Sequence, residues 1–80
     1  MNSVVLPMET RPIQQFDTVA LLNAAPEDHL AAGQVGAVVE VYSPDDFEVE
    51  FVDLQGKTLG LRTCRRGELL LLKHEALAAA

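Results

Sequence analysis

Apolar and polar side chains alternate most regularly in the segment FEVEF at residues 47–51. Two phenylalanines and a valine occupy every second position there, and Glu48 and Glu50 lie between them. A period of two is typical of a β-strand with one buried and one solvated face. We therefore predict a strand from Phe47 to Asp53 whose two glutamates face water.

The alternation returns after a short turn, LQGK, in which Gly56 is free to adopt a positive φ. The next segment, TLGLRT at residues 58–63, predicts a strand with Leu59 and Leu61 on one side and Arg62 on the other. In the resulting hairpin, Arg62 is expected to face outward beside the two glutamates.

Three more strands are indicated by runs of β-branched and apolar residues between turn-forming residues. They span residues 16–22 (FDTVALL), 37–42 (AVVEVY) and 68–73 (ELLLLK). In the loop after the first strand Pro26 interrupts any helix, so one helical turn at His29–Ala32 is the most that we expect.

Five short strands in 80 residues predict one small all-β domain. Because open sheet edges invite aggregation, the sheet is expected to curl into a partly open barrel. Gly36 and Gly60 are the places where we expect it to bend. The predicted organisation is a flexible N-terminal arm at residues 1–15, the barrel at 16–73 and a short C-terminal tail at 74–80.

The composition is that of a globular protein, with 49% apolar and 22% charged residues. A formal net charge of −6 disfavours general binding to nucleic acid. The single cysteine excludes an internal disulfide, and the N-terminus lacks the pattern of a signal peptide, so a cytoplasmic protein is expected. No apolar run approaches the ~20 residues of a membrane span, and no membrane association is expected.

The charges are segregated along the chain. Nine acids and no base lie between Pro12 and Gly56, whereas five bases and one acid lie between Lys57 and Lys73. One interpretation is that the bases neutralise the acids across neighbouring strands. The other is that Arg65 and Arg66, in the connection before the last strand, contact a carboxylate or phosphate of a partner.

Two groups of carboxylates are candidate chemical sites. Glu48 and Glu50 are expected about 6.6–6.8 Å apart along one strand face, a separation that overlaps that of inverting glycosidases, but so small a barrel offers no cleft around them. Asp45, Asp46 and Asp53 lack the spacing of a Ca²⁺ loop. We expect no metal site, no cofactor and no enzymatic activity.

Cys64 has two arginine neighbours that could lower its pKa, and His74 is the nearest candidate base in the sequence. Without a fixed partner base, we interpret this cysteine as a small residue filling space at a strand end. The four leucines at residues 69–72 predict a strand buried on both faces rather than a short helix, because six residues are too few for a stable helix. Alternate leucines of a strand cannot all face one core. One pair needs a cover, for which the tail, the arm, a partner protein or a second copy of the chain are alternatives.

Three segments of the chain, GQVGAVVEV at residues 33–41, FEVEF at 47–51 and GKT at 56–58, resemble a family of small uncharacterised bacterial proteins with an SH3-like (KOW-like) barrel. The resemblance covers about residues 16–72. It implies the barrel fold and no established enzymology. Genes of such proteins often lie beside those of small toxins or nuclease-like proteins, which implies an antitoxin-like or accessory role.

The chain departs from two functions of such barrels. KOW modules that bind RNA or ribosomes usually carry bases around the Gly-x-x-Gly turn, whereas the turn at residues 31–36 (AAGQVG) has none. SH3 domains bind proline-rich peptides in an aromatic groove, whereas this chain has no tryptophan and one tyrosine, Tyr42.

These observations predict a non-catalytic interaction module that docks on a basic protein partner. The acidic binding face is predicted to comprise Asp45, Asp46, Glu48, Glu50 and Asp53. The alternative is an RNA- or ribosome-associated module that uses a basic tip. That tip is predicted to comprise Lys57, Arg62, Arg65 and Arg66.

Overall fold

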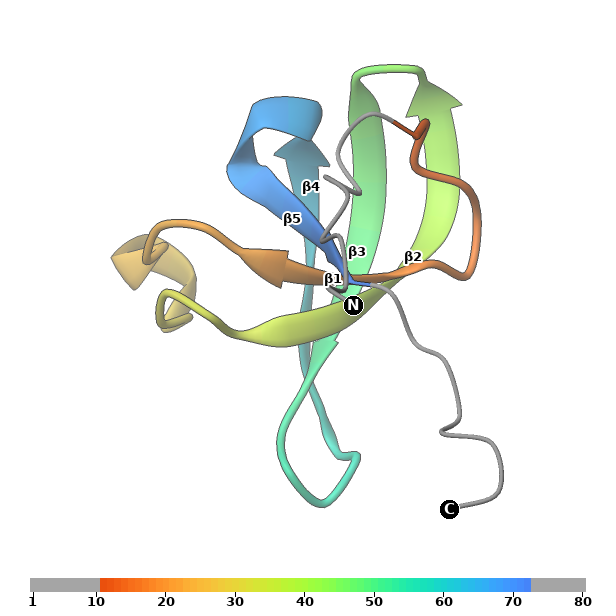
Figure 1. The fold of residues 1–80 in the computed structure, drawn as a ribbon. Coiled ribbons are helices and arrows are strands. Elements are labelled where there is room, and N and C mark those ends of the chain that lie inside the picture. Colours follow the sequence, from red (N-terminus) through yellow and green to blue (C-terminus); the bar gives the residue numbers. More distant parts are fainter. Residues whose placement is uncertain (1–10, 73–80) are drawn as a thin grey trace, which may run out of the picture.

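The computed structural model describes residues 11–72, which form a single sheet of five antiparallel strands (Figure 1). The strands are β1 (Thr18–Leu21), β2 (Val35–Ser43), β3 (Asp46–Val52), β4 (Thr58–Arg65) and β5 (Leu69–Leu72). Two single turns of 3-10 helix, η2 (Pro26–Asp28) and η3 (Arg66–Glu68), interrupt the connections, and the described residues contain no α-helix.

The strand order is β4-β3-β2-β1-β5, so β4 and β5 form the two outer edges of a sheet that does not close. β2 continues the sheet between its two halves, because its first residues pair with β1 and most of its length pairs with β3. Its ladder with β3 contains two register shifts, which are typical of β-bulges that bend a strand. The predicted five-stranded, all-β and partly open architecture is confirmed.

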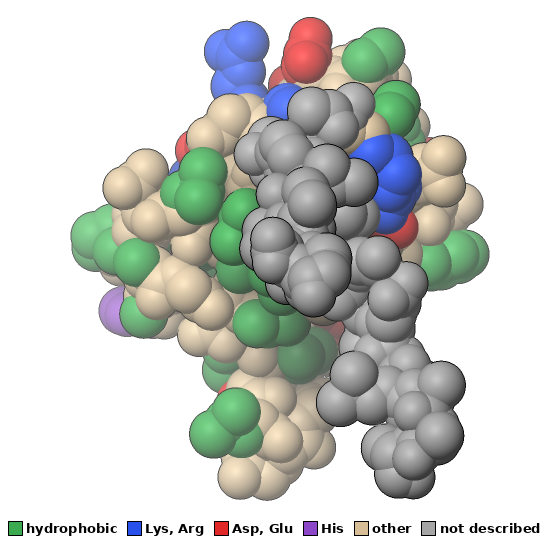
Figure 2. Space-filling view, viewed as in Figure 1, with side chains coloured by type: hydrophobic (Ala, Val, Ile, Leu, Met, Phe, Trp, Pro, Cys, Tyr) green, Lys and Arg blue, Asp and Glu red, His purple; other side chains and the backbone are tan. Residues whose placement is uncertain are grey.

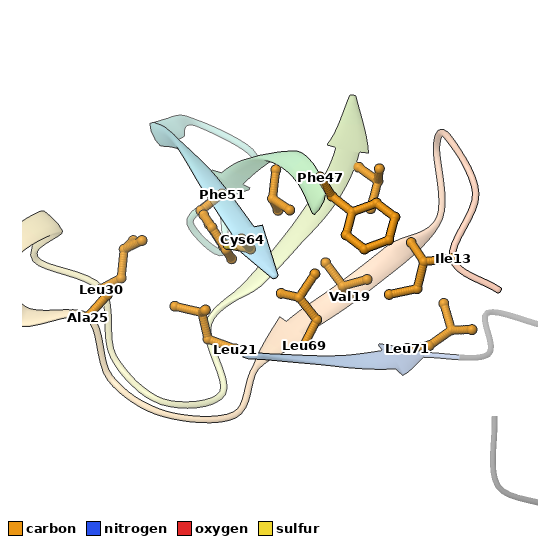
Figure 3. Packing of buried hydrophobic residues seen from close by; sticks show 12 residues of the cluster. Ile13, Val19, Leu21, Ala25, Leu30, Phe47, Phe51, Cys64, Leu69 and Leu71 are labelled. Carbon is orange, nitrogen blue, oxygen red and sulfur yellow. The ribbon is translucent and has the colours of Figure 1, made fainter. Parts of the chain in front are cut away.

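The core forms on the side of the sheet that the alternation in β3 predicts. Phe47, Val49 and Phe51 are fully buried, and the glutamates between them face the opposite side. Twelve residues make up the core cluster, and Figure 3 shows how their side chains converge between the two halves of the sheet. Burying an aliphatic or aromatic side chain stabilises the fold by about 1.5–3 kcal/mol, so this cluster is the main source of stability.

Gly36 of β2 lies against β3 so closely that no side chain fits. A Cβ atom placed on it would lie 2.7 Å from the Glu50 carbonyl oxygen and 2.8 Å from side-chain atoms of Phe51 and Val49. Gly60 of β4 has open space at the same point and no such restriction. The two glycines that we expected to serve the same purpose therefore differ: only Gly36 permits a close approach.

Two predictions about local structure in the first half of the chain need correction. Phe16 is not in the first strand: it has a φ of 74° and is 75% exposed. The helical turn lies at Pro26–Asp28, before the expected His29–Ala32, because proline is favoured in the first turn of a helix and His29 adopts a left-handed φ of 58°.

The expectation of a loosely held arm through residue 15 is also wrong for its last part. Ile13 is only 4% exposed and packs in the core cluster, where Figure 3 shows it near Phe47 and Val19. Arg11 forms an ion pair with Asp17 at 3.2 Å, which ties this segment to the start of β1. The rest of the predicted arm and the predicted tail lie outside the described residues.

The last strand confirms the preference for a strand over a helix at the four leucines. Leu69 and Leu71 are buried, whereas Leu70 is 41% exposed. The strand is therefore buried on one face in the described part of the chain, and the expectation of burial on both faces is wrong.

Candidate interaction surface

Three glutamates lie together on the outer face of the sheet, and we call them the carboxylate row: Glu40, Glu48 and Glu50. Glu40 of β2 is directly opposite Glu48 of β3, and Glu50 is two residues further along the same strand. Like charges directly opposite each other in a sheet are destabilising. The fold thus holds negative charges side by side on the face opposite the core, where Glu40 is exposed and Glu48 and Glu50 are half-buried.

Among residues 11–72, hydroxyl groups and not basic side chains donate the side-chain hydrogen bonds to this row. Thr63 donates to Glu48 at 2.7 Å, and Tyr42 donates to the same carboxylate at 3.3 Å. Thr58 donates to Glu50 at 2.6 Å. Neutral donors orient the carboxylates but leave their charge in place.

The surroundings of the carboxylate row also change the pKa of Tyr42. Partial desolvation, and after it the charge of the Glu48 carboxylate, raises the pKa of Tyr42 above its ordinary value. This side chain is 59% exposed, so a neutral phenol lies on the surface beside the carboxylate row.

The other acids of the predicted face lie at the two ends of β3. Asp46 accepts a hydrogen bond from the Ser43 hydroxyl at 2.9 Å, and Asp45 lies in the same turn. Asp53 accepts hydrogen bonds from the backbone N–H groups of Gln55 and Lys57 in the next turn, at 2.9 and 2.8 Å. These aspartates flank the carboxylate row, and two of them shape the turns.

Arg62 does not face outward, and that prediction is wrong. It pairs with Val49, whose side chain is fully buried, whereas Glu48 and Glu50 pair with Thr63 and Leu61. Since side chains alternate along a strand, Arg62 points to the core side, and Leu61 points outward. The arginine expected to neutralise the glutamates is therefore on the opposite face of the sheet.

On that face Arg62 joins three carboxylates from two separate segments. It bonds Glu27 at 3.0 Å and Asp28, both in η2, and lies 3.5 Å from Glu68 of η3. The hydrogen bond to Asp28, more than the one to Glu27, raises the pKa of Arg62 against the opposing effect of desolvation. Its Nε is buried and has no hydrogen-bond partner within the described part of the chain. We call this group the Arg62 cluster.

The structure does not bring the residues of the predicted basic tip together. Lys57 precedes β4, whereas Arg65 ends it eight residues later and Arg66 begins η3. Arg66 donates a hydrogen bond to the Leu69 carbonyl oxygen at 3.3 Å. Of these four residues only Arg65 and Arg66 are adjacent, because Lys57 lies at the opposite end of β4 and Arg62 points to the core side.

Cys64 is the penultimate residue of β4. Its side chain is fully buried against the core, opposite Phe47. Desolvation, and after it the charge of Glu68, raises the pKa of this thiol from 9.0 to about 11. The arginine neighbours therefore do not activate it, because Arg65 points to the other face.

Apolar side chains are exposed around the start of β4. Leu54, Leu59 and Leu61 are 100%, 47% and 60% exposed. An open groove of about 550 Å³ lies beside Leu59, and residues 31–35 and 52–54 form its other walls. Hydrophobic side chains are also visible at several places on the side of the molecule shown in Figure 2.

The place of Glu40 in the carboxylate row and the orientation of Arg62 in the Arg62 cluster were not predicted from the sequence. Glu40 joins the carboxylate row because of a register shift between Val38 and Glu40, which no sequence pattern marked. The orientation of Arg62 had a signal, since it lies two residues from Cys64, and cysteine is among the residue types most often buried. The alternation of Leu59 and Leu61 indicated the opposite orientation of the strand.

The part of the chain from residue 11 to residue 72 holds no group of three His, Cys, Asp or Glu side chains that is arranged to bind a metal ion. Within the same range, no helix is long and apolar enough to span a membrane.

A family model described as a domain of unknown function, DUF4926, matches residues 15–71. Searches of curated proteins and of solved structures gave no match. The matched segment contains the first four strands and nearly all of β5, and it spans well over half of the chain. The chain therefore belongs to the DUF4926 family.

Proposed function

We propose that this protein is a non-catalytic interaction module that docks on a basic protein partner through the outer face of β2, β3 and β4. One observation carries the proposal: Glu40, Glu48 and Glu50 lie together on the face of the sheet opposite the core, and Arg62 points away from them. The described ion pairs of Arg11 and Arg62 do not reach these glutamates.

Electrostatics explains why a basic partner fits this face. The chain has a net charge of −6, so its field attracts cations at long range. Lysine or arginine side chains placed over the carboxylate row would relieve the repulsion between Glu40 and Glu48. Charge complementarity of this kind chiefly speeds association and selects partners, and salt weakens it.

The finer features of the proposal rest on the resemblance described above. The strand order, with a 3-10 turn between the last two strands, supports an SH3-like barrel related to KOW modules. An antitoxin-like or accessory subunit of a cytoplasmic bacterial complex fits a small acidic module without an assigned catalytic residue. A nucleic-acid-binding function is less well supported, because the bases of the predicted tip are separated along β4.

Affinity capture with single-charge variants tests the proposal. The immobilised protein is incubated with an extract of its native cells at low and at high salt, and bound proteins are identified. We expect a basic protein that is retained at low salt and released at high salt. Glu48→Gln and Glu50→Gln should each weaken the retention.

Asp17→Asn is the matched control, because it removes one negative charge just before β1, from a carboxylate that is paired with Arg11 and lies outside the predicted acidic face. It should leave the retention close to that of the unmodified protein. Equal losses in all three variants would mean that net charge, and not the carboxylate row, determines binding. The absence of any salt-sensitive protein partner would refute the proposal.

A further inference from the structure

The outer edge of β4 lacks a partner strand in the described structure. β4 is eight residues long, is the last strand on its side of the open sheet, and pairs with β3 alone. Outside the strand ladders, no backbone–backbone hydrogen bond between described residues involves residues 58–65. Such an edge presents unpaired N–H and C=O groups at alternate residues, which another strand can use.

The side chains beside this edge do not protect it. Proteins commonly blunt an exposed edge with charged side chains or proline. Here Leu59 and Leu61 project from the outer face, and the charged Arg62 points to the other side. The groove beside Leu59 extends the apolar surface past the start of the strand.

Negative charge lies on both sides of the strand. On the outer side, Glu48 and Glu50 are the direct neighbours of Thr63 and Leu61. On the other side, the Arg62 cluster combines three carboxylates with one guanidinium, and the side chains of its acids are 42–63% exposed. A strand that approaches β4 therefore meets an excess of negative charge on either face.

A second copy of this chain suits the edge poorly, because it brings a further net charge of −6 with it. A basic segment of another protein is complementary to the charges on both sides. Aliphatic side chains at alternate positions of that segment would contact the two exposed leucines, and the residues between them would face the Arg62 cluster.

We propose that β4 binds an extended basic segment of a partner protein by strand addition. Aliphatic residues of the segment pack against Leu59 and Leu61, and its lysine or arginine residues lie toward Glu27, Asp28 and Glu68. This inference rests on the proposed function, since it specifies how the basic partner is held.

A peptide probe tests the backbone contacts directly. The probe is an eight-residue peptide of alternating valine and arginine, matched to the length of β4, with both ends capped. Two further versions carry N-methyl groups, one on every valine and the other on every arginine. Because alternate residues of a strand direct their N–H groups to the same edge, only one version places its methyl groups against β4.

We expect the unmodified peptide to bind the full chain, one methylated version to bind at least about tenfold more weakly, and the other to bind nearly as well. Hydrogen exchange should slow at alternate amides of β4 when the peptide is bound. Equal binding of all three peptides would overturn strand addition but leave the basic partner of the proposed function in place. Loss of binding with both methylated versions, or no binding of the unmodified peptide, would also overturn it.

Matched leucine variants locate the edge. Leu61→Lys is expected to weaken the peptide by about tenfold. Leu70→Lys, an exposed leucine on the opposite edge strand β5, is the control and should have no effect. If Leu61→Lys does not fold, the amides that gain protection in the unmodified chain decide the question. Protection in β5, or a loss confined to Leu70→Lys, would contradict the inference.

Discussion

The close approach of β2 to β3 at Gly36 predicts a large difference between two glycine substitutions. In Gly36→Ala the new methyl group would lie 2.7 Å from a backbone carbonyl oxygen of β3, so the strand itself has to move. Overpacking of this kind destabilises a protein by about 1–3 kcal/mol. Reduced entropy of the unfolded chain returns about 0.4–1 kcal/mol, which leaves a net loss of about 1–2 kcal/mol.

Gly60→Ala is the matched control in the neighbouring part of the same sheet. Nothing lies within 4 Å of the added methyl group, so only the favourable entropic effect remains, up to about 1 kcal/mol. Urea denaturation followed by circular dichroism measures both effects. With an m-value of about 1 kcal/mol per molar urea, the midpoint should fall by about 1–2 M for Gly36→Ala and rise by up to about 1 M for Gly60→Ala. Similar midpoints for the two variants would refute the packing argument.

Three further predictions concern stability. The raised pKa of Cys64 implies that the thiol ionises only in the unfolded state as the pH rises from 9.0 to about 11, so about 2–3 kcal/mol of stability should be lost in that window. The urea midpoint of the parent should therefore fall more steeply with pH there than that of Cys64→Ala. Parallel pH profiles of the two midpoints would contradict this. Arg62→Met should destabilise the fold by only about 1 kcal/mol, because the acidic partners of Arg62 are partly exposed and water weakens the ion pairs. Arg65→Met is the control and should lower the urea midpoint less. Equal effects would show that the Arg62 cluster contributes little. Ile13→Ala should lower stability by about 2–4 kcal/mol in thermal unfolding, whereas an unchanged midpoint would mean that residues 11–15 do not contribute to the core.

The elements with clear alternation could be predicted from the sequence. β3 has its buried and solvated faces where Phe47, Glu48 and their neighbours indicated them, since the core requires one face of the strand to be apolar. The number of strands and the open sheet also followed from the turns. The one helical turn was misplaced, because a proline that ends a helix can also begin one.

The orientation of β4 could not be predicted in the same way. Its leucines suggested one face and Cys64 the other, and the register with β3 decides between them. That register pairs Gly60 with Phe51 and Cys64 with Phe47 on the core side, which leaves the leucines on the outer face. The positions of Glu40 and the Arg62 cluster depend on bulges and on loop contacts that are distant in the sequence, which local patterns do not encode.

The most direct test of the central claim is to locate the bound partner on the isotope-labelled protein by amide chemical-shift mapping. The captured basic partner is added at low salt, and the shift of each amide is followed. The account predicts the largest changes in β2, β3 and β4 around Glu40, Glu48 and Thr63, and their reversal at high salt. Changes confined to β1 and β5, or changes that salt does not affect, would contradict it.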